Sequence, residues 1–308
     1  MRVMFLGTSA GRPTKARNVT SIALLLPERA GAFWLFDAGE GTQHRLLETR
    51  LKLNKLERVF ITHLHGDHVY GLPGLLSSRS YFEGAGPLQV FGPAGLKAYI
   101  EHAFKMTGAR LEYELDIRET APGRLWQDES FAVDAAELQH RLPCFGYRIE
   151  EAAKPGRLDT ERLARIGLPP GPLYGRLKRG EDVVLPGGEP VRAAEVVGPP
   201  MPGRIVTILG DTRPCDNAVV LAKGAHLLVH EATFAAGMEE KAAAYGHSTI
   251  AQAAETAAKA GACRLAVTHF SSRFSPEAVD EMVGSVQDVF PNTVPAEDFL
   301  ELEVGRPE

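Results

Sequence analysis

The sequence predicts an α/β fold, because short apolar runs typical of strands alternate with segments of helical character. The runs 59–61 and 205–209 are rich in β-branched residues and too short for helices, so we expect buried strands there. Among the segments between such runs, Ile250 to Ala260 is rich in alanine and places Glu255 and Lys259 at the i,i+4 spacing of a helical ion pair.

The N-terminal part of the chain adds further strands. The stretches 19–26 and 33–36 have strand character, and Asp37-Ala38-Gly39-Glu40-Gly41 marks a turn after the second of them. No repeat of fixed period is visible. The α/β class therefore holds along most of the chain.

Four of the predicted strands lead directly into polar residues. The runs 59–61, 205–209, 227–229 and 265–267 are followed by Thr62-His63, Gly210-Asp211, His230-Glu231 and Thr268-His269. Open α/β sheets bind ligands at the carboxyl ends of their strands. We therefore expect these four strand ends to converge on one site.

The composition is that of an ordinary globular protein, with 44% hydrophobic and 24% charged residues in 308. This length fits one large domain with an insertion. The longest apolar stretches, 22–26 and 225–229, are far shorter than the roughly 20 residues of a membrane helix, and the N-terminus turns polar too early for a signal peptide. We expect a cytoplasmic protein that does not enter the membrane.

The cysteines and the net charge argue against further classes. Cys144, Cys215 and Cys263 are odd in number and form no C-x-x-C pair, which disfavours a disulfide framework and a thiolate zinc site. The net charge of −5 creates no overall basic field. Any contact with nucleic acid must therefore be local.

The interval 154–203 differs from its surroundings. It is rich in proline and glycine, with Pro169-Pro170-Gly171-Pro172 at its centre, and we predict an inserted flexible arm rather than core. From Lys154 to Gly180, seven basic residues stand against two acidic ones. The resulting local charge of +5 reverses the sign of the whole chain.

The sequence His63-Leu64-His65-Gly66-Asp67-His68 carries four metal-capable side chains within six residues, directly after a predicted strand. Imidazole and carboxylate ligands suit zinc or a neighbouring transition metal. Four such ligands exceed what one open catalytic zinc normally takes from the protein, which favours two metals. The alternative is a histidine-rich surface loop.

A site for two metals needs ligands from elsewhere, and the other strand ends offer them. His140 stands at a strand-to-turn junction, His269 ends an apolar strand, and Asp211 follows another strand between Gly210 and Thr212. A lone histidine at a strand end is commonly a hydrogen-bonded structural residue, and an aspartate at such a turn is commonly a cap. The nearby cluster favours ligands, with Asp211 as a bridging carboxylate.

These residues and further blocks make the chain similar to the ribonuclease Z family of the metallo-β-lactamase superfamily, over essentially its whole length. The blocks that carry the resemblance are Phe5-Leu6-Gly7-Thr8-Ser9-Ala10-Gly11-Arg12-Pro13-Thr14, Arg17-Asn18-Val19-Thr20-Ser21, 36–43, the histidine cluster, His140 with Pro143 and Gly146-Tyr147, Gly210-Asp211-Thr212-Arg213, 230–234, 246–249 and 268–274. The histidine cluster alone indicates the superfamily. The basic arm and the blocks around His230 and His247 narrow it to the family.

The resemblance implies a four-layer αβ/βα metallo-β-lactamase sandwich that forms a homodimer. It also implies a ligand set in which one zinc ion is held by His63, His65 and His140, a second by Asp67, His68 and His269, and both by the bridging Asp211. Two Zn²⁺ per subunit are expected, although such ligands also accept Mn²⁺, Fe²⁺ or Co²⁺.

The implied activity is an endoribonuclease that removes the 3′ trailer from precursor tRNA, leaving a 3′-hydroxyl on the tRNA and a 5′-phosphate on the trailer. Asp67 is the expected general base, His247 would protonate the departing oxygen, and Glu231 would orient His247. Two simpler alternatives stand beside these roles. His247 could be a residue at the start of a helix, and Glu231 a turn carboxylate.

The resemblance implies that the segment 154–203 is an arm that binds the tRNA body. The expected RNA-binding residues are Lys154, Arg157, Gly171, Pro172, Arg176, Lys178 and Arg179. A structured RNA is recognised mainly through phosphates and 2′-hydroxyls, which favours such a basic segment, whereas the simpler alternative is a solvated charged face. Met201 occupies a position where the family often has lysine.

Two other functions share some of these features. A small-molecule metallo-hydrolase, such as a phosphodiesterase or a thioesterase of the glyoxalase II type, has the same cluster but does not need a basic arm. A non-catalytic RNA-binding subunit usually has substituted metal ligands, and in this sequence every ligand position is filled.

Overall fold

The computed structural model of the chain describes residues 1–185 and 187–306, which form two compact units. The first unit comprises Met1–Glu150 and Ile205–Gly305, and the second comprises Glu151–Arg204 together with Arg306. The segment 154–203, which we expected to be inserted, lies within the second unit.

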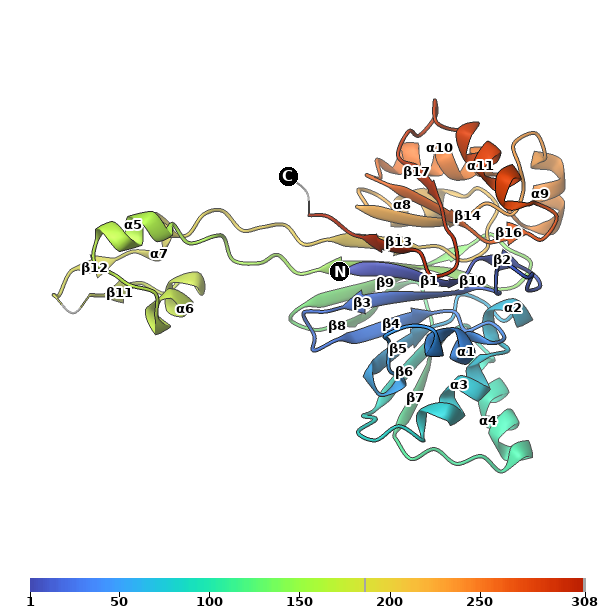
Figure 1. Ribbon diagram of the computed structural model, residues 1–308, viewed down its shortest axis with the longest axis horizontal. Coiled ribbons are helices and arrows are strands. Elements are labelled where there is room, and N and C mark those ends of the chain that lie inside the picture. The colour runs from blue at the N-terminus through green and yellow to red at the C-terminus, as the bar shows by residue number, and fades with distance from the viewer. Residues whose placement is uncertain (186, 307–308) are drawn as a thin grey trace. The chain divides into compact units, whose positions relative to one another are not determined.

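The first unit contains a seven-stranded sheet in the order β18-β1-β3-β4-β5-β6-β7 (Figure 1). Its strands are β1 (Arg2–Gly7), β3 (Ser21–Leu26), β4 (Ala32–Phe36), β5 (Leu56–Phe60), β6 (Leu88–Gly92), β7 (Leu115–Glu119) and β18 (Glu301–Glu303). Strands β4 to β7 run parallel, so their carboxyl ends share one edge. The helices that follow or precede these strands are α1 (Thr42–Leu47), the 3-10 turn η1 (Leu53–Lys55), α2 (Gly66–Val69), α3 (Leu72–Arg79) and α4 (Leu96–Thr107).

A second seven-stranded sheet has the order β17-β15-β14-β13-β10-β9-β8. Its strands are β8 (Gly123–Gln127), β9 (Phe131–Leu138), β10 (Cys144–Glu151), β13 (Ile205–Ile208), β14 (Leu227–Glu231), β15 (Leu265–Thr268) and β17 (Thr293–Pro295). Its helices are α8 (Asp216–Leu221), α9 (Glu239–Tyr245), α10 (Ile250–Ala260) and α11 (Pro276–Gly284). The short strands β2 (Ser9–Ala10) and β16 (Phe270–Ser271) pair with each other.

Three hydrophobic clusters separate four layers of secondary structure. The central cluster joins the two sheets, for example Trp34 and Phe60 with Phe131 and Tyr147. A second cluster fills the space between the first sheet and α1, α3 and α4, and a third lies between the second sheet and α8, α10 and α11 (Figure 1). The expected αβ/βα sandwich is confirmed.

The strands predicted from the sequence are present, with shifted ends. Strand β14 continues through His230 and Glu231, whereas we placed its end at Val229; both residues are buried and belong to the ladder with β15. The four polar strand ends belong to two sheets, because β5 lies in the first sheet and β13, β14 and β15 lie in the second. The helix predicted from Ile250 to Ala260 has those bounds, and Lys259 pairs with Glu255.

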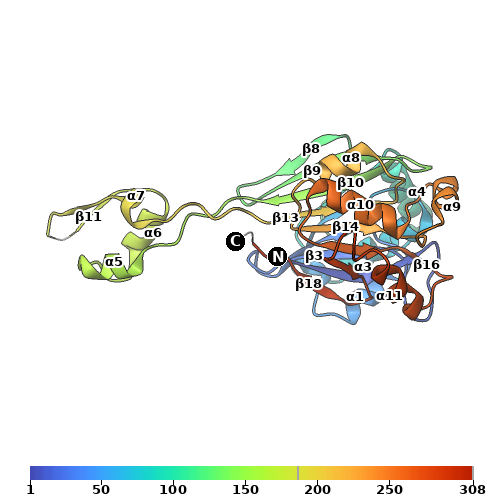
Figure 2. The ribbon, with the colours of Figure 1, turned by 90° about the horizontal axis from the view of Figure 1, so that it is seen from above.

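The second unit has its own small hydrophobic core, which its proline and glycine content did not lead us to expect. It contains α5 (Thr160–Arg165), α6 (Pro172–Lys178), β11 (Val183–Val184), β12 (Pro190–Val191) and α7 (Ala193–Val196) (Figure 2). Leu163, Leu177 and Val196 are buried together at its centre. At its two chain ends, Glu151 accepts hydrogen bonds from Arg204 and Arg306.

No helix within the described ranges is both long and apolar enough to cross a membrane. Cys144, Cys215 and Cys263 are all free thiols, as expected.

Candidate metal centre

Seven metal-capable side chains from both sheets meet in the first unit. They are His63, His65, Asp67 and His68 after β5, His140 between β9 and β10, Asp211 after β13, and His269 after β15. His63, His68, Asp211 and His269 are buried. These are the residues that the sequence resemblance selected, and the structure brings all of them together.

The first group of ligand atoms belongs to His63, His65, His140 and Asp211. His65 Nδ1 lies 2.9 Å from His63 Nε2 and 3.1 Å from His140 Nε2. Asp211 Oδ2 is 3.6 Å from His63 Nε2 and 4.0 Å from His140 Nε2. Four ligand atoms thus face one small volume.

The second group belongs to Asp67, His68 and His269. His68 Nε2 lies 3.2 Å from His269 Nε2, and Asp67 Oδ2 is 3.6 Å and 3.3 Å from these two nitrogens. Asp211 Oδ2 is also 3.5 Å from His68 Nε2 and 3.4 Å from His269 Nε2. The Asp211 carboxylate therefore lies between the two groups.

The outer nitrogens of His63, His68, His140 and His269 have hydrogen-bonding partners, which direct the inner nitrogens toward the cluster. Asp37 Oδ2 accepts a hydrogen bond from His68 Nδ1 at 2.8 Å. The Gly246 carbonyl accepts one from His140 Nδ1 at 2.7 Å, and Thr233 Oγ1 is 2.8 Å from His269 Nδ1. His63 Nδ1 lies 3.0 Å from Thr62 Oγ1.

Asp37 is a functional residue that the sequence reasoning missed, because we interpreted it only as part of a turn. It is buried, and its carboxylate also accepts hydrogen bonds from the Thr62 backbone amide and hydroxyl. Its φ is +58°, and that of the ligand His269 is +57°. Left-handed conformations are uncommon for residues other than glycine, although aspartate and histidine adopt them more readily than most, and they concentrate at functional sites. The sequence feature that could have identified Asp37 is a carboxylate directly after a predicted strand.

The electrostatics of the cluster couple its acids to its imidazoles. Burial acts to raise the pKa of Asp211, but His269 and His68 hold it well below its usual range. The pKa of Asp67 is likewise lowered by His68 and His269, against the effect of burial. Burial lowers the pKa of His63 and keeps that imidazole neutral, as a metal ligand must be.

His247 lies beside the cluster and is backed by Glu231. Its Nδ1 is 2.9 Å from Glu231 Oε1 and 3.8 Å from Asp211 Oδ2. Although burial acts to lower it, the charge of Glu231 raises the pKa of His247 to about 9. Glu231 is 2% exposed at the end of β14, so it is not a solvated turn carboxylate. His247 also directly precedes Ser248 and the α10 cap Thr249, so the helix-start description is accurate too.

The donor set fits metal ions. Histidine nitrogens and carboxylate oxygens without a neutralising cation would leave buried charge and unshared lone pairs in one small volume. The outer hydrogen bonds also match the arrangement that surrounds metal-binding histidines in general. The centre can therefore hold a metal cofactor.

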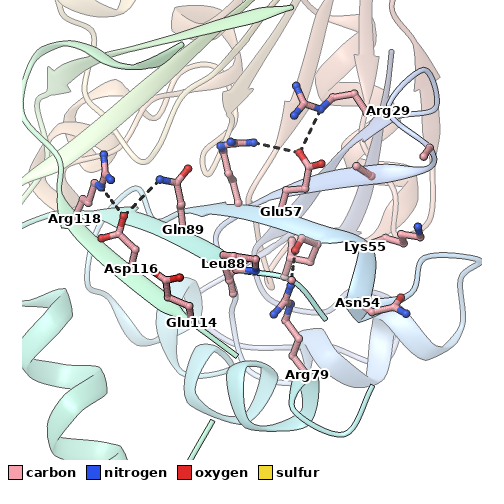
Figure 3. A pocket seen from close by; sticks show the side chains of 16 residues that line it. Arg29, Asn54, Lys55, Glu57, Arg79, Leu88, Gln89, Glu114, Asp116 and Arg118 are labelled. Carbon is pink, nitrogen blue, oxygen red and sulfur yellow. Dashed lines mark hydrogen bonds and ion pairs between the residues drawn. The ribbon is translucent and has the colours of Figure 1, made fainter. Parts of the chain in front are cut away.

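A larger hollow of about 620 Å³ lies elsewhere in the first unit (Figure 3). It is lined by the amino ends of the parallel strands β4 to β7, opposite to the end at which such sheets bind ligands. Several of its charges are paired with one another: Arg29 and Arg58 pair with Glu57, and Arg118 pairs with Asp116. We assign it no function.

The expected RNA-binding residues all belong to the second unit. Arg157, Gly171, Pro172, Arg176, Lys178 and Arg179 are exposed there, and Lys154 is partly buried. Lys178 lines two hollows of this unit, one with Arg157 and the other with Lys154 and Arg179. Glu181 bridges Arg176 and Arg179, and the backbones of Met201 and Lys154 pair with each other.

Comparisons with known proteins agree with this geometry. The family model of the anti-Pycsar protein Apyc1 matches residues 1–129. A ribonuclease Z from Bacillus licheniformis is 52% identical over 306 residues, which is 99% of this chain and 100% of the relative. The crystal structure of the short form of human tRNase Z is 30% identical, with a TM-score of 0.72 over 99% of this chain and 100% of that one. The metallo-β-lactamase fold protein YhfI from Bacillus subtilis is 18% identical, with a TM-score of 0.67 over 98% and 99%.

The hydrogen bond from His68 to Asp37 yields a test of the centre. The substitution Asp37→Asn keeps the side-chain shape but removes the charged acceptor, so we expect metal affinity to fall by roughly 10- to 100-fold. Competition with a chromophoric chelator measures this affinity. Asp134→Asn, which removes an exposed pair with Arg124, is the matched control and should leave affinity as it is. Equal affinities for both variants would contradict the role of Asp37.

Proposed function

Because the chain belongs to the ribonuclease Z family, we propose that it is a metal-dependent endoribonuclease that removes the 3′ trailer from precursor tRNA. Its cut leaves a 3′-hydroxyl on the tRNA and a 5′-phosphate on the trailer. The observation that carries this proposal is the complete ligand cluster with His247 and Glu231 beside it, in a chain similar to ribonuclease Z along its whole length. Such a substrate also argues for a cytoplasmic enzyme.

We infer that two zinc ions occupy the centre. His63, His65 and His140 would hold one ion, Asp67, His68 and His269 would hold the other, and Asp211 would contribute to both groups. The distances of Asp211 Oδ2 to both groups support this sharing. When bound, the ions supply Lewis-acid chemistry: they activate a water molecule for attack and stabilise the charge that develops on the phosphate.

Asp67 is the proposed general base. It lines the pocket over the centre, and its Oδ2 accepts a hydrogen bond from the Gly11 backbone amide at 2.7 Å. This bond fixes the carboxylate at the site where a water molecule must lose its proton. The low pKa of Asp67 keeps it ionised before the reaction.

His247 is the proposed general acid. Its Nδ1 donates to Glu231, so the proton that it transfers to the departing 3′-oxygen comes from Nε2. The Glu231 carboxylate holds the imidazole in this orientation and favours its protonated form. Glu231 is thus a positioning residue.

The second unit supplies the proposed contact with the tRNA body. Arg157 and Lys178 are exposed and form no ion pair among the described residues, and both line the same hollow. Exposed cations without an ion-pair partner can neutralise RNA phosphates, whereas Arg162 already forms an ion pair with Glu195.

The exposed side chains of the first unit support a homodimer. Leu47 and Met106 belong to α1 and α4, and Tyr70 and Tyr81 follow the ends of α2 and α3 by one and two residues. The helices α1, α3 and α4 lie on the outer side of the first sheet (Figure 1). Each is more than 60% exposed, and Tyr81 is 87% exposed. We infer that these side chains contribute to one apolar surface, which is typical of an interface. We propose that two chains associate through these helices.

Product mapping tests the proposed function. The enzyme is incubated with precursor tRNAs that do or do not encode a 3′-CCA, and both product ends are mapped. We expect one cut on the 3′ side of the discriminator region, with a 3′-hydroxyl on the tRNA. The metal-loaded variants Asp67→Ala and His247→Ala should lose activity, by roughly 100- to 10,000-fold for His247→Ala. Full activity of the metal-loaded Asp67→Ala protein would refute its role as the base.

Charge reversal tests the role of the second unit. In the double variant Arg157→Glu and Lys178→Glu, we expect kcat/KM for precursor tRNA to fall by at least about 10-fold near physiological salt, because two phosphate contacts become repulsive. A small diester such as bis(p-nitrophenyl) phosphate should still be hydrolysed. The matched control is Arg162→Ala, which should cleave RNA like the wild type. Equal losses on both substrates would contradict an RNA-binding role and favour a small-molecule hydrolase.

Sedimentation equilibrium tests the homodimer. The wild-type protein should sediment at twice the chain mass of 33.4 kDa at micromolar concentration. Tyr81→Glu places a charge on the proposed interface and should shift the equilibrium toward the chain mass. A wild-type protein that sediments at the chain mass would refute the interface.

A further inference from the structure

The pocket over the metal centre has an aromatic and cationic side that the proposed chemistry does not use. Its volume is about 290 Å³, at the lower end of the range for ligand pockets. Besides ligands and His247, its lining includes Phe234, Tyr245 and Arg273. A pocket of this size admits one unit of an extended strand rather than a folded RNA.

Ring contacts order these side chains relative to the centre. The His247 ring lies 5.0 Å from that of His140 and 5.5 Å from that of His269, measured between centroids. It is also 6.1 Å from the Phe234 ring, which in turn lies 6.2 Å from the Tyr245 ring. His247 therefore stands between the metal ligands and the aromatic pair.

The turn that follows α9 fixes Tyr245 in this place. Tyr245 is the last residue of α9, and Gly246 ends the helix with a φ of +82°. A Cβ atom on Gly246 would lie 3.0 Å from His140 Nδ1, and the Gly246 carbonyl accepts a hydrogen bond from that nitrogen. Tyr245 and His247 are thus the chain neighbours of Gly246, which is hydrogen-bonded to the proposed metal ligand His140.

Two arginines complete the aromatic side. The Arg273 guanidinium lies 5.2 Å from the Phe234 ring centroid, and the Arg141 guanidinium lies 5.0 Å from that of Tyr245. Arg141 also donates a hydrogen bond to the Ala244 carbonyl, which ties it to the end of α9. Phe234 is buried, whereas Tyr245 is 49% exposed and is accessible to a ligand.

This combination has the chemistry of a nucleobase platform. Unpaired bases in single-stranded RNA stack on aromatic rings and on arginine guanidinium planes. The exposed Tyr245 ring and the exposed Arg273 guanidinium, which lies against Phe234, line the same pocket and offer both kinds of surface there. The buried Phe234 ring contacts both of them.

We propose that Tyr245 and Arg273 hold the base of the nucleotide on the 5′ side of the cut, the one that ends the product. This inference rests on the proposed function. If His247 protonates the departing 3′-oxygen, the nucleotide that bears this oxygen lies on the His247 side of the scissile phosphate. Phe234 and Tyr245 lie next to His247, so the base of this nucleotide can reach them.

A comparison of two substrates across variants tests the platform. One precursor tRNA carries its natural base 5′ of the cut, and the other carries an abasic nucleotide there. For each enzyme we measure the ratio of kcat/KM between the two substrates. The wild-type ratio should be roughly 5 to 150, since stacking on one aromatic residue is worth about 1–3 kcal/mol.

Tyr245→Leu keeps apolar bulk but removes the ring plane, and we expect the ratio to fall by about 5-fold or more. Tyr245→Phe retains the plane and should retain the ratio, as the matched control. Arg273→Lys keeps the charge but removes the guanidinium plane, so it should also lower the ratio, whereas a pure phosphate contact would leave it unchanged. The ratio does not depend on the active fraction of a variant.

A wild-type ratio near 1, or an unchanged ratio in Tyr245→Leu, would overturn the platform while trailer removal itself stands. A wild-type enzyme that cleaves neither precursor would refute the proposed function, and the platform with it.

Discussion

Asp211 carries a negative charge where solvent hardly reaches, and the arrangement of the site follows from that charge. A buried carboxylate is costly unless cations or hydrogen-bond donors surround it. Here His63, His68 and His269 approach its Oδ2 within 3.6 Å, and they come from both sheets. The carboxylate thereby links the two sheets at the place where their strand ends meet, and metal ions would complete its neutralisation.

The outer hydrogen bonds convert this cluster into a rigid site. Asp37, Thr62, Thr233 and the Gly246 carbonyl each lie within hydrogen-bonding distance of the outer nitrogen of one imidazole. The same Gly246 turn positions Tyr245 and His247. Because the Gly246 carbonyl also accepts a hydrogen bond from His140, this turn fixes the proposed acid, the aromatic side of the pocket and one metal ligand together. Chemistry and substrate placement therefore depend on one short stretch of backbone.

Local features of the sequence predicted much of this. His63 to His68 are contiguous, and their ligand character is visible without the fold. Asp37 was missed because its partner His68 is 31 residues away and only the pairing of β4 with β5 brings them together. The bounds of β14 were too short because Glu231 is polar yet buried against His247. The core of the second unit escaped notice because Leu163, Leu177 and Val196 are far apart between glycines and prolines.

We propose that this protein binds two metal ions at one shared carboxylate. Titration of the metal-free protein with zinc, followed by calorimetry, tests it most directly. We predict that two ions bind per chain and that the midpoint of thermal unfolding rises as they do, because the ions bind only the folded cluster. Binding of a single ion, or saturation without any thermal stabilisation, would contradict the account.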